Sequence, residues 1–368
     1  MKPIKLTINT DTQTYPIIIG SNLISKFNFF LKKNSISFEK CLVVVDKNIS
    51  KKKLNILKKS INKKKIFFHF IEANEKNKNQ TTTMKIVDVL LKKNFSRLDC
   101  LIAVGGGITG DVSGFAASIF KRGLQLINFP TTLLSQVDSS IGGKTGVNTK
   151  YGKNLIGSFY QPKLVISDID FLETLPKREI ACGYAEILKH SIIANKYFYN
   201  FLNSNVLNII NLKSPFIEKA IFESCKIKKK VVEKDEKEKN FRKVLNFGHT
   251  FAHAFEATTG YTKKLNHGEA VLLGINAALK FSLLNNLINN KDYYSILEHF
   301  AKSDLPYNLK DYFKLKDLNK ILFFMTKDKK NNSKKINLIL LKRIGSPIIH
   351  NHYNVNDIKS FLKKELFY

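Results

Sequence analysis

The sequence predicts two domains: an N-terminal α/β domain with a largely parallel sheet (residues 1–175) and a mostly α-helical C-terminal domain (residues 176–368). Three observations support this fold class. A chain of 368 residues is longer than one hydrophobic core usually serves. In its first half, short apolar runs alternate with helix-like segments, which is typical of parallel α/β layers. After Leu175-Pro176, helical periodicity dominates.

The first half contains the predicted sheet. Residues 4–10 and 15–20 look like an opening pair of strands, and CLVVVD (41–46) is the short apolar run of a buried parallel strand. The remaining predicted strands are 65–71, 100–107 (running into a turn), 124–130 and 163–170. Helices are predicted at 55–61, 82–93 and 111–120. The second half carries helical periodicity at 178–195, 216–236, 251–260, 268–286 and 293–302, and one strand-like run at 335–345.

Composition indicates a cytosolic globular protein. The apolar fraction is 43%, the first residues lack the apolar core of a signal peptide, and no run approaches the ~20 apolar residues of a membrane span. We therefore expect no membrane association. The four cysteines are scattered without CxxC spacing, as expected for reduced thiols in the cytoplasm: Cys41, Cys100, Cys182 and Cys225.

The net charge of +31 raises the possibility of nucleic-acid binding. Only five of the 61 basic residues are arginines, so 56 are lysines. Base edges and planar phosphates are read best by the bidentate fork of arginine. The lysines are spread over every segment, so we expect no specific nucleic-acid partner, only weak, salt-sensitive adhesion to polyanions.

Glycine marks the segment where a ligand is expected. Eleven of the eighteen glycines lie between Gly105 and Gly157, interleaved with charged side chains. Residues 105–110 fit G-x-G-x-x-G between a strand and a helix, which suits a dinucleotide pyrophosphate but also occurs in simple tight turns. No acidic residue follows about 20 positions later to hold a ribose, since Gln125 and Asn128 occupy that region. Asp111 is a candidate contact to the nicotinamide side.

Four side chains in the second half could bind a metal ion. Glu186 lies in a predicted helix, His249 and His253 form H-x-x-x-H on one helical face, and His267 precedes another helix. A carboxylate with imidazoles suits catalytic zinc or a similar divalent ion, although a single histidine is more often an ordinary core or surface residue. Thr250 follows His249, so the H-E-x-x-H motif of zinc proteases is absent.

Several motifs occur in order along the chain. They are GGGITGDVSGFAAS, KRG, FPTTLLSQVDSSIGGKTGVN, GKNLIGSFYQP, GYAEILKH, and LNFGHTFAHAFEA followed by HGEAV. Together they resemble the 3-dehydroquinate synthase family of sugar phosphate cyclases, over almost the whole chain. The resemblance implies an N-terminal Rossmann-like NAD-binding domain, a helical C-terminal domain that binds metal and substrate, and an active site in the cleft between them. It also implies a homodimer.

The resemblance assigns roles to individual residues. Three are implied to bind Zn²⁺ or Co²⁺: Glu186, His249 and His267. The implied NAD contacts are Asp46, Glu75, Lys78, Gly107, Ile108, Thr109, Gly110, Asp111, Thr131, Thr132, Asp138, Lys144, Lys153, Phe171, Leu172, Glu173 and Thr174. The implied substrate and catalytic residues are Arg122, Lys144, Lys153, Asn154, Lys189, Lys228, Arg242, Asn246 and His253, with Lys329 or Lys330 closing over the phosphate. Where the family has a Pro-Asp-Gly turn before Glu75, this chain has Ile71-Glu72-Ala73-Asn74, and Asn74 tolerates the left-handed conformation of a glycine.

The implied reaction belongs to the shikimate pathway of aromatic amino-acid biosynthesis. An anionic small molecule, 3-deoxy-D-arabino-heptulosonate 7-phosphate, would be converted to 3-dehydroquinate and phosphate by a phosphate-eliminating lyase. The steps are transient oxidation by NAD⁺, elimination of phosphate, reduction by the same NADH, ring opening and aldol closure, so that NAD is not consumed. Two alternatives remain: another sugar phosphate cyclase, or a metal-dependent polyol dehydrogenase, which would release NADH.

Overall fold

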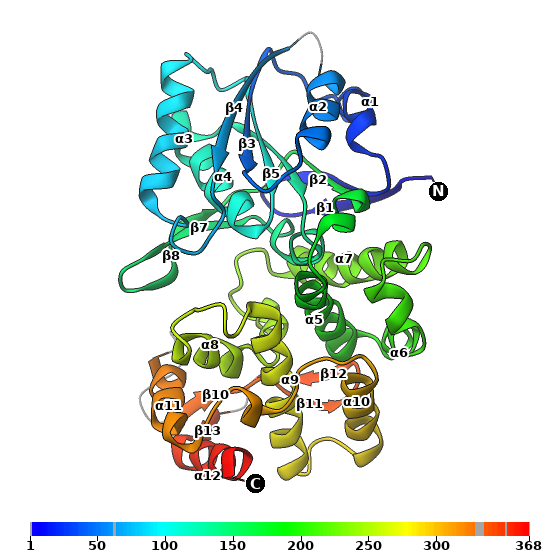
Figure 1. The fold of residues 1–368 in the computed structure, drawn as a ribbon, viewed down its shortest axis with the longest axis vertical. Coiled ribbons are helices and arrows are strands. Elements are labelled where there is room, and N and C mark those ends of the chain that lie inside the picture. The colour runs from blue at the N-terminus through cyan, green and yellow to red at the C-terminus, as the bar shows by residue number, and fades with distance from the viewer. Residues whose placement is uncertain (1, 62–63, 328–334, 350–351, 368) are drawn as a thin grey trace. The chain divides into compact units, whose positions relative to one another are not determined.

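The structure, a computed structural model, describes residues 2–61, 64–327, 335–349 and 352–367 (Figure 1). The chain forms two compact units. The first contains Met1–Pro176 together with Ile221–Lys237, and the second contains Lys177–Ala220 and Glu238–Tyr368. The chain therefore leaves the first unit, returns to it for one segment, and leaves it again.

The first unit is built on a seven-stranded sheet in the order β1-β2-β9-β6-β5-β3-β4. Its strands are β1 (Ile4–Asn9), β2 (Thr14–Gly20), β3 (Lys40–Asp46), β4 (Lys65–Ile71), β5 (Cys100–Gly105), β6 (Gln125–Pro130) and β9 (Leu164–Asp168). All neighbours pair in parallel except β1 and β2, which form an antiparallel hairpin. The predicted parallel α/β layer is confirmed.

Helices cover both faces of this sheet (Figure 1). On one face α1 (Phe27–Lys33) and α2 (Lys51–Ser60) supply Phe27, Phe30 and Leu57 to a buried core. On the other face α3 (Gln80–Lys92) and α4 (Gly107–Ile119) supply Leu90 and Val112 to a second core. Strands buried on both faces need apolar side chains at successive positions, which explains the unbroken run CLVVVD.

A separate hairpin stands beside the sheet. It pairs β7 (Lys144–Thr149) with β8 (Gly152–Phe159) in antiparallel fashion, and α4 packs against it. Gly146 and Gly157 face each other where the strands come closest, because a Cβ at Gly157 would lie 2.0 Å from the carbonyl oxygen of Thr145. The glycines that suggested a ligand therefore also serve, at these two positions, to let two strands approach.

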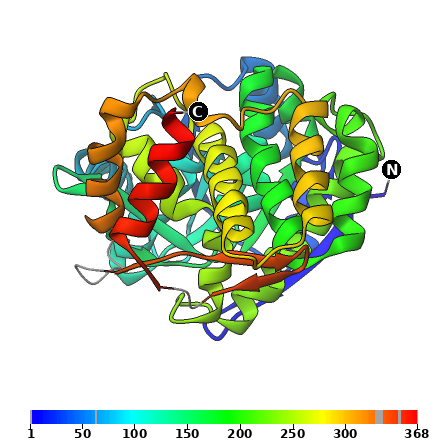
Figure 2. The same ribbon diagram turned by 90° about the horizontal axis from the view of Figure 1, so that it is seen from below.

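The second unit is mostly helical, as predicted. It contains α5 (Lys177–Ala194), α6 (Lys196–Ile210), α8 (His249–Thr258), α9 (His267–Leu284), α10 (Asn290–Lys302), α11 (Leu318–Lys327) and α12 (Val355–Phe367). Helix α7 (Phe216–Lys234) begins in this unit and passes to the first at Ile221. Helix α9 is central and packs against α5, α8, α10 and a short strand, β11 (Leu340–Arg343) (Figure 2).

The predicted strand at 335–345 is wrong as one element. It divides into β10 (Lys335–Asn337) and β11 (Leu340–Arg343). β10 pairs with β13 (His352–Asn354), and β11 pairs with β12 (Ser346–Ile348), in two separate two-stranded sheets. None of the helices in the described residues combines the length and apolarity needed to cross a bilayer.

Candidate functional site

The glycine-rich turn lies at the carboxyl edge of the parallel sheet. β5 ends at Gly105, and α4 begins at Gly107 with Gly106 as its N-cap. Thr109 packs closely against Gly105, because a Cβ added at Gly105 would lie 2.4 Å from the Thr109 Oγ1. Strand order reverses between β3 and β5, and the carboxyl ends of strands at such a reversal form a ligand-binding crevice. A pocket at this edge is lined in part by Gly105, Gly106, Gly110, Asp111 and Lys144.

Most of the predicted NAD contacts follow the carboxyl ends of these strands. Asp46 ends β3, Thr131 follows β6, and residues 171–174 lie in the 3-10 helix after β9. The Asp46 carboxylate accepts hydrogen bonds from the backbone and side chain of Asn48, 3.0 and 3.1 Å, while burial raises the Asp46 pKa. Thr131 N–H donates to the carbonyl of Gly105, 3.0 Å, which ties the glycine turn to the end of β6.

Lys78 joins the helix of the glycine turn to the β7–β8 hairpin. Its ammonium lies 2.5 Å from Asp111 Oδ2 and donates to Asn154 Oδ1 at 2.7 Å. Burial raises the pKa of Asp111, and the nearby Lys78 charge opposes that shift. Three residues predicted from separate motifs are thus in direct contact.

Asn148 holds the same hairpin to the loop that carries Glu75. Its side chain donates to Glu75 Oε2 at 2.7 Å and accepts from Asn154 N–H at 3.0 Å, and its own N–H donates to the carbonyl of Lys78 at 2.8 Å. Lys153 also faces Glu75, at 3.3 Å. Sequence reasoning missed Asn148: it lies inside the GKTGVN motif, but an amide that only positions neighbours leaves no spacing signal.

Asn74 does not adopt the left-handed conformation that an asparagine would tolerate at this position. Its backbone φ angle is not positive. Its side chain instead accepts from Asn77 N–H at 2.9 Å, and its N–H donates to the carbonyl of Glu72. A side-chain turn therefore replaces the glycine turn before Glu75 and Lys78.

Side chains from other parts of the first unit contact the second half of the glycine-rich segment at Gly142 and Gly143. Gly142 N–H donates to Tyr15 Oη at 3.1 Å, and Gly143 adopts a φ of +66° with the Gln161 side chain against it. Gln161 in turn donates to Glu236 Oε1 at 2.7 Å. These contacts fix the backbone that enters Lys144, and sequence reasoning missed both Gln161 and Glu236.

Lys228 is brought to the first unit by α7. Its ammonium contacts the Asp138 carboxylate and donates to the Asp138 carbonyl at 2.6 Å. Arg122 is not brought to this edge: it follows α4, is exposed, and lies three residues before the start of β6, at the amino end of that strand. Lys329 and Lys330 lie outside the described residues.

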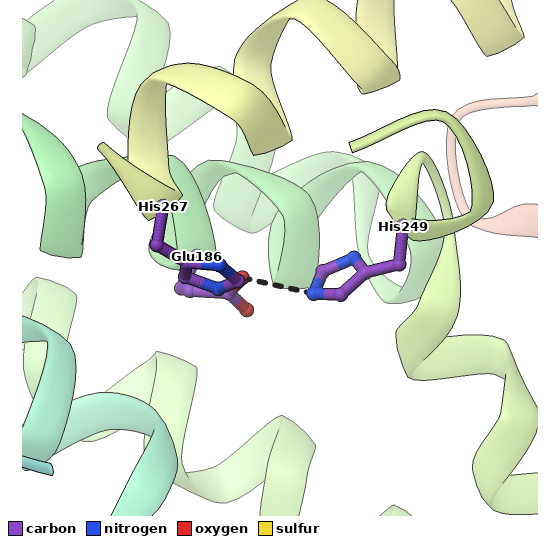
Figure 3. A group of neighbouring side chains, drawn as sticks. All are labelled: Glu186, His249 and His267. Atoms are coloured by element: carbon purple, nitrogen blue, oxygen red, sulfur yellow. Dashed lines mark ion pairs between the residues drawn. The ribbon is translucent and has the colours of Figure 1, made fainter. Parts of the chain in front are cut away.

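The second unit brings together a carboxylate and two imidazoles (Figure 3). Glu186 comes from α5, and His249 and His267 are the first residues of α8 and α9. Their nearest side-chain donor atoms all lie within 4.8 Å of one another. Glu186 Oε1 lies 3.5 Å from His249 Nε2 and 3.8 Å from His267 Nε2.

The chemistry of this group fits a divalent cation. Glu186 is buried, and its Oε1 accepts no hydrogen bond from the described residues. Burial, Lys189 and the neighbouring histidines hold the pKa of His249 well below its usual value, so that the neutral, ligating imidazole is favoured. An orphaned carboxylate oxygen facing two imidazole nitrogens is the donor set that Zn²⁺ or Co²⁺ accepts.

The second unit also contains the other predicted residues Lys189, Arg242, Asn246 and His253. Lys189 is buried one helical turn after Glu186, and its ammonium contacts the Glu186 carboxylate. Arg242 and Asn246 belong to the 3-10 helix Phe241–Asn246, which packs against α5. The His253 ring is exposed and lies edge-on to His249 at 5.4 Å between centroids.

The fold is that of the sugar phosphate cyclases. A structure of 2-deoxy-scyllo-inosose synthase complexed with carbaglucose-6-phosphate, NAD⁺ and Co²⁺ aligns with a TM-score of 0.88, at 24% identity over 98% of this chain and 100% of that one. A 2-epi-5-epi-valiolone synthase from Streptomyces hygroscopicus subsp. jinggangensis 5008, with NAD⁺ and Zn²⁺ bound, aligns with a TM-score of 0.83, at 23% identity over 95% of this chain and 96% of that one.

The family follows from the sequence relatives. Residues 68–182 match the family model of the 3-dehydroquinate synthase N-terminal part, and residues 183–331 match that of its C-terminal part. A 3-dehydroquinate synthase of Pelagibacter ubique (strain HTCC1062) is 62% identical over 363 residues, which is 99% of each chain. The chain belongs to the 3-dehydroquinate synthase family.

Proposed function

We propose that the chain converts 3-deoxy-D-arabino-heptulosonate 7-phosphate to 3-dehydroquinate and inorganic phosphate, with bound NAD and Zn²⁺ or Co²⁺. The observation that carries this proposal is the 62% identity to a 3-dehydroquinate synthase over 99% of both chains. The cluster of Glu186, His249 and His267 supports it independently, because that reaction needs a Lewis acid.

NAD would supply the redox chemistry, and the divalent ion would act as a Lewis acid. When bound, NAD⁺ would take a hydride from the substrate and return it, while the divalent ion would acidify the hydroxyl and polarise the carbonyl that replaces it. The residues at the carboxyl edge of the sheet would hold NAD, and Glu186, His249 and His267 would hold the ion. Lys78 would keep Asp111 and Asn154 in place at the cofactor turn.

Cationic side chains would bind the substrate's anionic groups. Lys144 and Lys153 come from one hairpin, and charge-assisted hydrogen bonds from such groups are stronger than neutral ones. Lys189, Lys228 and Arg242 are buried, so each is held in a defined position rather than moving freely in solvent. Asn246 and His253 would complete the substrate contacts.

The proposal is tested by following two products in one assay. With substrate and a trace of NAD⁺, we expect phosphate release far exceeding the NAD⁺ present, with no lasting rise in NADH absorbance. Steady accumulation of NADH would instead indicate a polyol dehydrogenase. Phosphate released from a hexose 6-phosphate, but not from the heptulosonate, would indicate another sugar phosphate cyclase.

We also propose a cytoplasmic homodimer. The cytoplasmic assignment rests on the four cysteines, which are all free and buried. The dimer is an expectation from the family, and light scattering of the purified protein measures it directly.

A further inference from the structure

Glu256 is a buried carboxylate next to the metal-ligand candidates. It lies on α8, seven residues after His249, and is 6% exposed. Its Oε2 is 3.4 Å from His267 Nδ1, on the first residue of α9. It therefore joins the two helices that each begin with a candidate ligand. A spacing of seven places it on the same face of α8 as His249.

The contact defines which nitrogen of His267 carries the proton. Nδ1 faces Glu256, whose carboxylate can only accept a hydrogen bond when ionised, so Nδ1 carries the hydrogen. Nε2 then presents its lone pair on the side of Glu186 Oε1, 3.8 Å away. The carboxylate thus prepares the opposite nitrogen for a cation.

His249 repeats this arrangement with a different acceptor. Its Nδ1 lies 3.3 Å from the carbonyl oxygen of Phe247, and its Nε2 lies 3.5 Å from Glu186 Oε1. A carbonyl oxygen is also only an acceptor, so both imidazoles turn Nε2 toward the same carboxylate oxygen. Because Phe247 contributes backbone, no substitution removes its oxygen, and Glu256 is the acceptor that mutation can test.

His267 has the greater need of an outer partner. Its side chain is 33% exposed, against 12% for His249. A half-exposed imidazole at a helix start can rotate, and a hydrogen bond at Nδ1 restricts that rotation. A partner on the outer nitrogen also makes the inner nitrogen a stronger donor.

We propose that Glu256 is a positioning residue for His267: it holds the Nδ1–H tautomer and the ring orientation, and thereby strengthens binding of the divalent cation. This rests on the metal site of the proposed function. The alternative is that Glu256 only stabilises the packing of α8 on α9.

The experiment measures zinc affinity rather than turnover. Chelator competition on the full-length protein gives the Zn²⁺ dissociation constant of wild type, Glu256→Gln and Glu256→Ala, with thermal unfolding of each apoprotein alongside. We expect affinity to fall about 10- to 100-fold in Glu256→Ala, the usual effect of losing such a partner. Glu256→Gln should lose less, since its amide oxygen can still accept the hydrogen bond. Nitrogen chemical shifts of His267 should show the Nδ1–H tautomer in the wild-type apoprotein and a mixture in Glu256→Ala.

Two further variants separate the possible outcomes. Glu365→Gln makes the same chemical change at a carboxylate paired with Lys280 in the same unit, and should bind zinc like wild type. His249→Ala should lose zinc altogether. If His249→Ala loses zinc while both Glu256 variants keep wild-type affinity and tautomer, the role of Glu256 is refuted and the metal site stands. If wild type binds neither zinc nor cobalt, both proposals fail.

Discussion

His299 is a buried histidine without a role in the proposed reaction, and it makes stability depend on pH. It is fully buried on α10, its Nδ1 faces Asn203 Oδ1 at 3.0 Å, and its Nε2 accepts from the Tyr184 hydroxyl at 2.9 Å. Burial, helped by Lys302, lowers its pKa from 6.5 to about 4. The folded state therefore binds the proton more weakly than the unfolded state does.

Because the His299 pKa is lower in the folded state, the pH range of its effect on stability is defined. The stabilisation is complete above pH 6.5 and is lost as pH falls toward about 4. Between pH 7 and pH 5, His299 should remove on the order of 2 kcal/mol from the free energy of unfolding. Glutamine can offer one donor and one acceptor in the same place, so urea unfolding of His299→Gln should show a shallower pH dependence than wild type. Equal slopes would contradict the prediction.

At this scale the sequence identifies candidate side chains better than it identifies their partners. The H-x-x-x-H pattern places His249 and His253 on one helical face, yet the group of donor atoms that contains Glu186 and His249 is completed by His267 and not by His253. That grouping depends on how α9 packs against α5 and α8, which spacing along one helix does not encode. The roles of the individual site residues stay predictions. Asn148, Gln161 and Glu256 were missed because they act through neighbours.

Gly248 and Gly274 lie where helices α8 and α9 come into contact, and this close approach sets the distance between His249 and His267. A Cβ at Gly274 would lie 2.2 Å from the carbonyl oxygen of Gly248, and Gly248 itself has a φ of +77°. The contact is backbone to backbone, so no side chain can move aside. Gly248 directly precedes His249, and α9 begins with His267.

Gly274→Ala should therefore force the helices apart. We expect a loss of about 1–3 kcal/mol in the free energy of unfolding, with weaker zinc binding. Gly110→Ala is the matched control, because Gly110 is also helical but has open space around its missing Cβ. In urea unfolding without ligands, that variant should be unchanged or up to about 1 kcal/mol more stable. Equal effects of the two substitutions would argue against the packing explanation.

Elements with a clear period were predictable, and elements shaped by their partners were not. The strands of the parallel sheet and most long helices were found because apolar runs and helical faces recur along them. The β7–β8 hairpin was missed because its glycines suggest a loop, whereas they allow close strand approach. The run 335–345 contains a continuous apolar stretch, Leu338 to Leu341, that suggested one strand, whereas its two halves pair with different partners.

The whole molecule carries a net charge of +31, and this should produce adhesion without recognition. With 56 lysines and only five arginines, phosphate contacts would be diffuse and readily screened by salt. In a filter-binding assay with mixed-sequence DNA, we expect retention at low salt and none near ~0.15 M. A sequence-specific complex that survives physiological salt would instead reveal a nucleic-acid function.

The return of residues 221–237 to the first unit has a consequence for biosynthesis. Glu236 accepts hydrogen bonds from Thr12 and Gln161, and Lys228 contacts Asp138, so this segment completes structure laid down much earlier in the chain. A ribosome makes the whole sheet, and then residues 177–220, before these partners emerge. The first unit therefore cannot complete its structure until residues 221–237 have been synthesised, and these follow the first residues of the second unit. The two units therefore cannot fold strictly one after the other during translation.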